Sequence, residues 1–429
     1  MSSEWPRKLL GEIAEVFTGF SFKGEKYLPS GAGVRVVRGD NVTEHSVRWG
    51  GKEKCWPAVT EELRPFMLRA GDVVIGMDGS KVGKNFAGIT QYDDGTLLAQ
   101  RVARVRAREG VNQNFIQYLI CNQQFTDYVQ SVYTGTSIPH ISKGQIQRFE
   151  VYAPPLQDQN WIASLLKALD DRITLLRETN ATLEAIAQAL FKSWFVDFDP
   201  VRAKLEGRTP EGMDEATAAL FPDGFEESAL GLVPRGWRVG VLGDVAQTVR
   251  QQLQPSELHA NINYVGLEHI PRKSLSLVSW GTADGLESAK ATFGKGDILF
   301  GKLRPYFHKV VVAPFDGVCS TDILVCQAKK AAYYGFVAMQ LFSTTLIEYA
   351  ERLSNGAKMP RVGWKDITAY PAVIPSEAIA SEYTKTIKPL LARMQANVHE
   401  AQTLATLRDT LLPRLISGQL RLNEIDYEN

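Results

Sequence analysis

The chain has 429 residues, 44% of them hydrophobic, and carries 48 basic and 48 acidic side chains. This length is sufficient for two or three domains with cores of their own, and the balanced charge excludes a uniformly basic nucleic-acid-binding protein, so any surface for a polyanion must be a local patch. The opening MSSEWPRKLL lacks the apolar core of a signal peptide, and no run of eighteen apolar residues occurs, so we expect a cytoplasmic chain with no membrane contact.

The first 155 residues predict a globule of mixed α/β structure. Short runs rich in valine and isoleucine, such as residues 34–39 and 72–77, are typical of strands, and residues 112–130 of helix. The segment QRVARVRARE at 100–109 predicts a strand with one charged face, which either lines a DNA backbone or is a solvated edge. Its arginines are Arg101, Arg104, Arg106 and Arg108.

A long helix is predicted at residues 156–196. From Ile162 to Trp194, seam positions recur at alternate spacings of four and three, and Asn180 is the one polar interruption. This heptad pattern is typical of a coiled coil, so a second helix must pack against the first.

Residues 197–236 predict a connector. Proline, glycine and acidic residues are scattered through it without a sustained period, apart from a short helical MDEATAALF. This composition is typical of a segment that covers distance between two folded parts, and we expect its role to be structural.

A second mixed α/β globule is predicted at residues 237–376, and a second long helix with a C-terminal segment at 377–429. The second seam lies 221 positions after the first and is also interrupted by an asparagine, Asn397. Pro389 interrupts the helical pattern, which predicts two segments, the firmer one starting at the proline.

The two halves of the chain are copies of one unit. LLGEIAEV at 9–16 recurs as VLGDVAQT at 241–248, and GTSIPHI at 135–141 recurs as GAKMPRV at 356–362. The predicted fold class is therefore α+β, with two globules of mixed α/β structure separated by two long antiparallel coiled-coil helices in a pseudo-two-fold internal repeat.

The two asparagines predict the register of the helices. If they face each other in an antiparallel pair, the numbers of opposed residues sum to 577, and a buried amide pair fixes this alignment. Leu166 then lies opposite Leu411, and Trp194 opposite Tyr383.

No catalytic or metal-binding motif is complete in the sequence. GMDGSKVGKN at 76–85 lacks a glycine and the Ser/Thr of a phosphate loop, and no Asn-Pro-Pro-aromatic, GxSxG or HExxH motif occurs. The four cysteines and six histidines show no zinc-site spacing. We therefore expect a chain that is not an enzyme, with no catalytic residues, no metal and no cofactor.

Glycine-flanked loops with basic and hydroxyl side chains occur at matching places in both halves. Glycine allows close approach of the backbone to a phosphate, and the side chains supply donors. The loop bodies differ while their flanks match, as two readers of different base sequences require. The alternative is that these are ordinary turns with solvated charges. The candidate DNA-contacting residues are Ser80, Lys81, Lys84, Thr136, Ser137, His140, Lys302, Arg304, Tyr306, Lys358 and Arg361.

Together these segments resemble the DNA-specificity subunit of type I restriction-modification systems over nearly the full length. The similarity rests on the repeated openings, the junction GTSIPHIS to VYAPPLQDQNWIASLLKALDDRI, the segments ALFKSWFVDFDPVRAKLEG and PEGMDEATAALFPDGFEESALGLVPRGW, and LRDTLLPRLISGQLRL at 407–422. One departure is that the first junction has Pro154-Pro155-Leu156 where the second reads Pro375-Ser376-Glu377, so we expect a different entry into the second helix.

The resemblance implies two target-recognition domains, each binding half of a split, asymmetric DNA site, with the helices setting the gap. It also implies no activity of the chain alone, but binding of two methylase subunits that modify adenine, and then of ATP-driven restriction subunits. A helix of about 39 residues spans about 58 Å, or about 17 base pairs. A solitary two-headed DNA-binding regulator is the alternative, and neighbouring methylase and helicase-like genes would decide against it.

Two candidate surfaces for the methylase subunits follow from the helices. The first is an exposed charged face with Asp170, Asp171, Arg172, Arg177 and Glu178. The second is an end patch for which burial in the core is the alternative. Its residues are Phe191, Lys192, Trp194 and Phe195.

Overall fold

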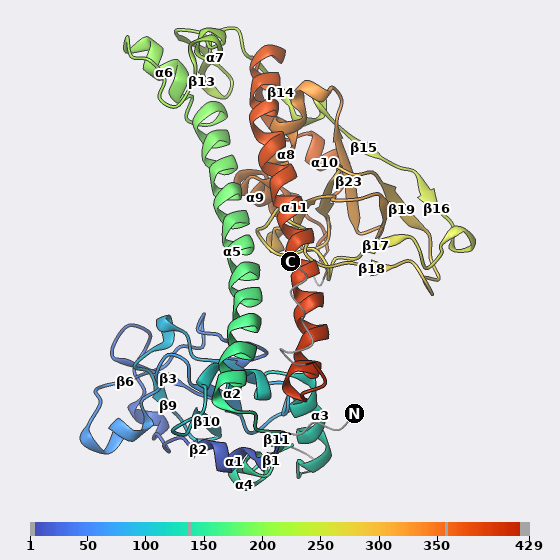
Figure 1. Ribbon diagram of the computed structural model, residues 1–429. Coiled ribbons are helices and arrows are strands. Elements are labelled where there is room, and N and C mark those ends of the chain that lie inside the picture. The colour runs from blue at the N-terminus through green and yellow to red at the C-terminus, as the bar shows by residue number, and fades with distance from the viewer. Residues whose placement is uncertain (1–4, 136–138, 357–358, 421–429) are drawn as a thin grey trace, which may run out of the picture. The chain divides into compact units, whose positions relative to one another are not determined.

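The computed structural model describes residues 5–135, 139–356 and 359–420 (Figure 1). It divides into two compact parts, unit 1 (residues 1–172 with 404–429) and unit 2 (residues 173–403). Two long helices, α5 (Leu156–Phe195) and α11 (Glu377–Ile416), each contribute residues to both units. Within the described ranges, no helix has the length and apolarity needed to cross a bilayer.

Unit 1 is built on a four-stranded antiparallel sheet in the order β2-β10-β7-β8. Ala103 and Val105 of the second strand face a core shared with two helices, α2 and α3, while Val74 and Val102 face a second core on the opposite side. The sheet is therefore buried on both faces, as its run of valines requires. The elements are β1 (Arg7–Leu9), α1 (Leu10–Ile13), β2 (Ala14–Thr18), β3 (Val34–Val37), β4 (Val42–Thr43), β5 (Ser46–Val47), β6 (Cys55–Trp56), β7 (Val73–Gly76), β8 (Phe86–Gly88), β9 (Leu97–Leu98), β10 (Val102–Ala107), α2 (Gln113–Ile120), α3 (Gln123–Val132), α4 (Lys143–Gln147) and β11 (Glu150–Tyr152).

Unit 2 repeats this plan, with a four-stranded sheet in the order β15-β23-β20-β21 followed by two helices. A five-stranded sheet, β16-β19-β22-β17-β18, replaces the three-stranded β6-β3-β9 of unit 1. The mixed α/β fold class and the duplication are therefore confirmed, and the units differ outside the shared sheet. The elements are β14 (Arg238–Val241), β15 (Ala246–Val249), β16 (Gln252–Leu253), β17 (Asn263–Val265), β18 (Gly281–Thr282), β19 (Lys290–Phe293), β20 (Ile298–Gly301), β21 (Val310–Val312), β22 (Gly317–Cys319), β23 (Ile323–Ala328), α8 (Tyr334–Phe342), α9 (Thr344–Leu353), α10 (Trp364–Thr368) and β24 (Pro371–Ile374).

The two long helices contact each other within unit 2. The Asn397 side-chain amide donates to Asn180 Oδ1 at 2.8 Å, and Asn180 Nδ2 donates to the carbonyl of Met394 at 3.0 Å. The rings of Trp194 and Tyr383 lie 5.5 Å apart. These residues lie opposite each other as in the register summing to 577; that the amide pair specifies this register stays a prediction.

Both long helices begin at equivalent positions, which corrects the expectation of a different entry. They start at Leu156 and Glu377, 221 positions apart, and both have 40 residues. The expected division of α11 at Pro389 is also wrong, because the helix is unbroken there. Ile387 and Leu391, which flank the proline, are buried in the core of unit 2 and hold the helix on both sides of the missing hydrogen bond.

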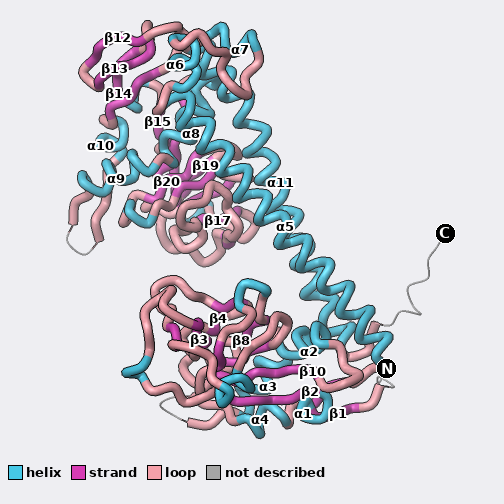
Figure 2. The backbone as a smooth tube through the Cα atoms, turned by 90° about the vertical axis from the view of Figure 1, so that its left-hand side faces the viewer, coloured by secondary structure: helices cyan, strands magenta, loops and turns pink. Residues whose placement is uncertain are grey.

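The connector is folded, which composition did not indicate. It forms α6 (Asp199–Leu205), α7 (Glu215–Leu220) and a hairpin of β12 (Phe225–Ser228) with β13 (Gly231–Pro234), which lie together in unit 2 (Figure 2). The Phe221 ring packs edge-on against Trp194 at 5.1 Å, and Trp237, directly after the connector, lies 5.9 Å from Phe195. Its order therefore comes from aromatic contacts with α5 and not from a period of its own.

Candidate nucleic-acid interface

In unit 1, the loop between β7 and β8 lies against the loop between α3 and α4. The amide of Gly79 donates to the carbonyl of Pro139 at 3.0 Å, and the amide of Ile141 donates to that of Met77 at 2.9 Å. The amide of Met77 in turn donates to the carbonyl of Arg101, just before β10, at 2.9 Å. Backbone hydrogen bonds therefore fix three segments, far apart in sequence, at one end of the sheet. We name this group loop pair 1.

The charged centre of loop pair 1 is Asp78. Its Oδ1 lies 2.5 Å from His140 Nδ1 and its Oδ2 lies 3.2 Å from Arg101 Nη1. The carboxylate is 20% exposed, whereas the His140 and Arg101 side chains are 45% and 70% exposed. A shielded anion therefore holds two accessible cationic or donor groups, which is an arrangement suited to an acidic or acceptor-rich ligand.

In unit 2, equivalent backbone groups make the same three hydrogen bonds. Arg304 donates to Pro360 at 2.8 Å, Val362 to Lys302 at 3.1 Å, and Lys302 to Asp322 at 3.0 Å. We name this group loop pair 2. The two loop pairs share one backbone scaffold although their sequences differ.

The charges are redistributed on this shared scaffold. The position of Asp78 is occupied by Leu303, and that of Arg101 by Asp322, because these residues make the corresponding backbone contacts. Arg361, which takes the place of His140, donates through Nε to Asp322 Oδ1 at 3.1 Å and through Nη2 to Oδ2 at 3.5 Å. The anion has therefore moved from the loop to the start of the strand, and a single arginine has replaced the two basic groups.

Left-handed backbone occurs at matching places in both loop pairs. Gly79 and Gly83 have φ of 99° and 88°, and Arg304 and His308, also four residues apart, both have φ of 50°. For a residue with a Cβ this conformation costs about 1–2 kcal/mol. Unit 2 thus holds two large side chains where unit 1 has glycine.

His308 is buried under this loop and was not among the sequence candidates. Its Nε2 lies 2.8 Å from the carbonyl of Phe342, and its ring packs on the Phe342 ring at 4.7 Å. Because a carbonyl only accepts, Nε2 carries the proton. Burial lowers the pKa of His308, so the neutral ring is favoured.

The structure brings most of the predicted site residues to these two loop pairs. Ser80, Lys81 and Lys84 are exposed in loop pair 1, and Tyr306 is exposed in loop pair 2, where Lys302 and Arg304 are half-buried. Thr136, Ser137 and Lys358 lie outside the described residues. DNA contact by any of them stays a prediction. Asp78 and Asp322 were missed, because they occupy different positions of the repeat and no shared offset relates them.

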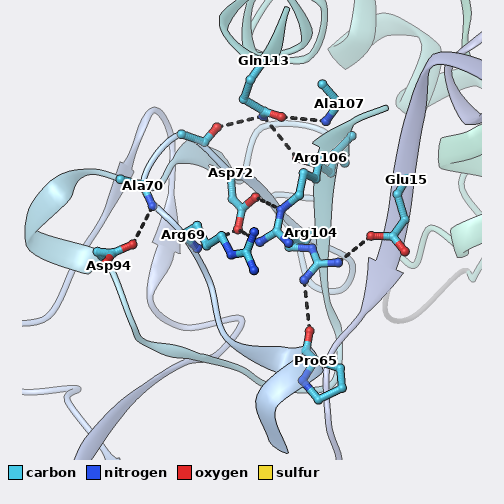
Figure 3. A network of polar contacts seen from close by, with 12 residues as sticks. Glu15, Pro65, Arg69, Ala70, Asp72, Asp94, Arg104, Arg106, Ala107 and Gln113 are labelled. Carbon is cyan, nitrogen blue, oxygen red and sulfur yellow. Dashed lines mark hydrogen bonds and ion pairs between the residues drawn. The ribbon is translucent and has the colours of Figure 1, made fainter. Parts of the chain in front are cut away.

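The alternating arginines of β10 do not form a solvated edge. This strand is internal in the sheet, between β2 and β7. Arg104, only 4% exposed, pairs with Glu15 at 2.6 Å, and Arg106 pairs with Asp72 through two hydrogen bonds of 2.7 Å (Figure 3). Burial lowers the pKa of Arg104. These two arginines join β10 to Glu15 of β2 and to Asp72, the residue before β7. They also line a cleft of about 900 Å³ beside the loop at residues 64–70.

The aromatic end of α5 is part of the core. Phe191, Trp194 and Phe195 are 5–7% exposed and pack around Tyr383, so core burial is the correct alternative for this patch. At the other end of α5, in unit 1, Asp170 accepts from Tyr118 and Arg408 side chains at 2.7 Å each. Asp170 is therefore engaged within unit 1.

Among the described residues, no group of three or more histidine, cysteine or acidic side chains is placed to hold a metal ion. Cys55, Cys319 and Cys326 are buried free thiols, and burial raises the pKa of the Cys319 thiol to about 12.

Known proteins share this architecture. Residues 2–185 match the family model described as type I restriction modification DNA specificity domain. The chain is 24% identical over 336 residues to the type I restriction enzyme MjaIX specificity subunit of Methanocaldococcus jannaschii, covering 74% of this chain and 71% of that protein. It is 25% identical over 356 residues to the HindI specificity subunit of Haemophilus influenzae, covering 71% and 77%. The crystal structure of the type I restriction-modification S subunit from M. genitalium has a TM-score of 0.55 at 15% identity, with 96% of each chain covered, which shows a common fold.

Proposed function

Because this chain belongs to the type I restriction-modification DNA-specificity subunits, we propose that it binds a bipartite, asymmetric double-stranded DNA site, one half-site per unit, across a gap that is not read. The observation that carries the proposal is that loop pair 1 and loop pair 2 have the same backbone hydrogen bonds but different side chains. A common scaffold allows both units to approach duplex DNA in the same way, while different side chains select different bases. We place such a chain in the cytoplasm.

We propose separate roles for this chain and for its partner subunits. The chain directs two methylase subunits, which modify adenine, and ATP-dependent restriction subunits, and has no catalysis of its own. The proposed parts are target-recognition domain 1 at 1–155, a first spacer helix at 156–196, a connector at 197–236, target-recognition domain 2 at 237–376, and the second spacer helix with the C-terminal segment at 377–429.

We propose that the long helices set the length of the gap. A helix of 40 residues spans about 60 Å at 1.5 Å per residue. Duplex DNA covers that length in about 18 base pairs. The two helices contact each other within each unit, through Asn180 and Asn397 in unit 2 and through Asp170 and Arg408 in unit 1.

The test is to map methylated adenines in cells that express this chain with its methylase and restriction partners. We expect two unlike half-sites at a fixed spacing. Inserting seven residues, about two helical turns, into both helices at the same layer should lengthen the gap and leave both half-sites unchanged. A matched insertion in the exposed turn after α6, at Gly207, should change neither. Altered half-sites with an unaltered gap would overturn the proposal.

A further inference from the structure

We propose that Arg361, oriented by Asp322, reads a guanine in the half-site bound by unit 2, and that unit 1 has no equivalent guanine reader at the matching position. This inference rests on the proposed DNA-binding function and assigns the base chemistry of one loop pair. Asp322 acts as a positioning residue, because it would touch the arginine and not the base.

The hydrogen bonds of Arg361 leave the guanine-binding edge of the guanidinium available. A guanidinium has five N–H groups, and here Nε and Nη2 each direct one toward the Asp322 carboxylate. The Nη1 group and the second N–H of Nη2 are left, and they form the outer edge of the fork. Two parallel donors of this kind match O6 and N7 of guanine in the major groove.

Arg361 is also fixed at its backbone. It forms isolated bridges with Leu303 and Asn355, and its amide and carbonyl both bond with those of Asn355 at 2.9 Å. Its side chain is 48% exposed and that of Asp322 is 28% exposed, so the arginine side chain is the more accessible of the two. The hydrogen bond to Asp322 raises the pKa of Arg361, which keeps the fork charged. Less side-chain freedom is lost on binding when a side chain is held in this way beforehand.

The surroundings of Arg361 fit a nucleic-acid ligand. Lys302 and Arg304 stand on the adjoining loop, whose backbone bonds to the neighbours of Arg361 at Pro360 and Val362. Tyr306 on the same loop is exposed. The basic side chains can position a phosphate backbone while the fork reaches a base edge.

Loop pair 1 cannot present the same pattern. His140 occupies the matching position, and its ring offers one free nitrogen after Nδ1 has bonded to Asp78. Arg101 approaches the same carboxylate through Nη1 alone, at 3.2 Å, so its fork is not held in one orientation. The two units therefore present different donors from one scaffold.

The competing explanation is that the Arg361–Asp322 pair only ties the loop to the start of β23. The two explanations differ in what Arg361→Lys does. Lysine keeps the charge and can keep the ion pair, but it lacks the planar fork that bonds to Asp322 along one edge and to O6 and N7 of guanine along the other. A tie would survive this change, whereas a guanine reader would not.

The experiment is selection of bound sequences from a random duplex pool by the full-length chain, comparing wild type with Arg361→Lys. Wild type should specify a guanine at one position of one half-site, and Arg361→Lys should reduce that preference by about 5- to 150-fold. The other half-site and the affinity for unrelated duplex should not change. Asp322→Asn should weaken the same position only, by a smaller factor. Arg352→Lys, an exposed arginine in the last turn of α9, is the matched control and should leave both half-sites as in wild type.

The outcomes separate this inference from the proposed function. If wild type selects a bipartite site and Arg361→Lys selects the same site with an undiminished guanine, the assignment of Arg361 is wrong and the proposed function stands. Loss of preference over the whole half-site also overturns it, because that result indicates a structural tie. If wild type selects no sequence at all, the proposed function and this inference fail together.

Discussion

Loop pair 1 and loop pair 2 have the same backbone hydrogen bonds but opposite placements of charge. In the first, an acidic side chain on the loop holds two basic groups, and in the second an acidic side chain at the strand start holds one arginine. The sheets below them have the same strand order. The difference shows that the scaffold of these loops is separable from the side chains they carry, and that the side chains can change sign without a change of backbone path.

The largest expected difference between the units lies in their cores. Trp194 packs in unit 2 against Phe221 of the connector and Tyr383 of α11, and no such aromatic cluster lies between the helices in the described part of unit 1. Trp194→Ala should lower the free energy of unfolding of unit 2 by about 3–5 kcal/mol, because it leaves a cavity in a packed core. Urea unfolding followed by circular dichroism measures this.

The matched control for that substitution is Leu175→Ala, on an exposed position of α5 within unit 2. Its effect should stay within about 0.5 kcal/mol. Equal effects of the two substitutions would show that the aromatic cluster does not stabilise unit 2.

The next effect concerns the left-handed residues. Gly79→Ala should destabilise unit 1 by about 1–2 kcal/mol, because φ is 99° while a Cβ there would meet no atom within 4 Å. Arg304→Gly should not destabilise unit 2, because glycine accepts the same conformation without strain. Thermal unfolding of both variants gives the comparison.

Gly39→Ala provides the control, since Gly39 also has open space around it but no positive φ, and it should be neutral. If Arg304→Gly costs as much as Gly79→Ala, the arginine side chain stabilises its loop by more than the strain it introduces, and the two positions are not equivalent.

The smallest effect is a pH dependence confined to unit 2. Burial lowers the pKa of His308, so the unfolded chain takes up the proton at a higher pH than the folded chain. The free energy of unfolding is therefore fully present above the ordinary histidine pKa of about 6.5 and is lost as the pH falls below it, by at most about 1.4 kcal/mol per pH unit. Urea unfolding at pH 7.5 and pH 5.5 tests this.

His308→Asn should reduce that pH dependence, because asparagine tolerates the left-handed backbone and does not titrate. His45→Asn is the control in unit 1, since His45 is exposed and has a φ of 62°. A slope that persists in His308→Asn would assign the pH dependence to other groups.

Much of the fold could be predicted from periodicity and repetition. The heptad seams predicted two long helices, because a helical period can be read within one segment. The offsets of the repeat predicted two copies of one globule, because they come from comparing the chain with itself. Burial of Arg104 could not be predicted, since alternation along a strand does not tell which strands flank it. The folded structure of the connector was missed because Phe221 is ordered by contact with Trp194 of α5 and not by its own sequence neighbours.

The sequence predicted which loops form the candidate site, but not which acidic and basic residues pair within it. Sequence placed His140 and Arg361 in corresponding loops, yet gave no means of choosing their acidic partners among the 48 acidic residues. Asp78 and Asp322 come from different segments in the two units, so a search for one repeated pair would have failed. Only the backbone contacts show that the two arrangements are variants of one site.

The proline in α11 has a mechanical consequence. Pro389 has no N–H to donate to the carbonyl of Lys385, whereas α5 has Ala168, which carries an N–H, at the corresponding position. Helices bend where a rung of the ladder is absent. Bending should therefore be concentrated in α11 rather than in α5, and Pro389→Ala should stiffen α11.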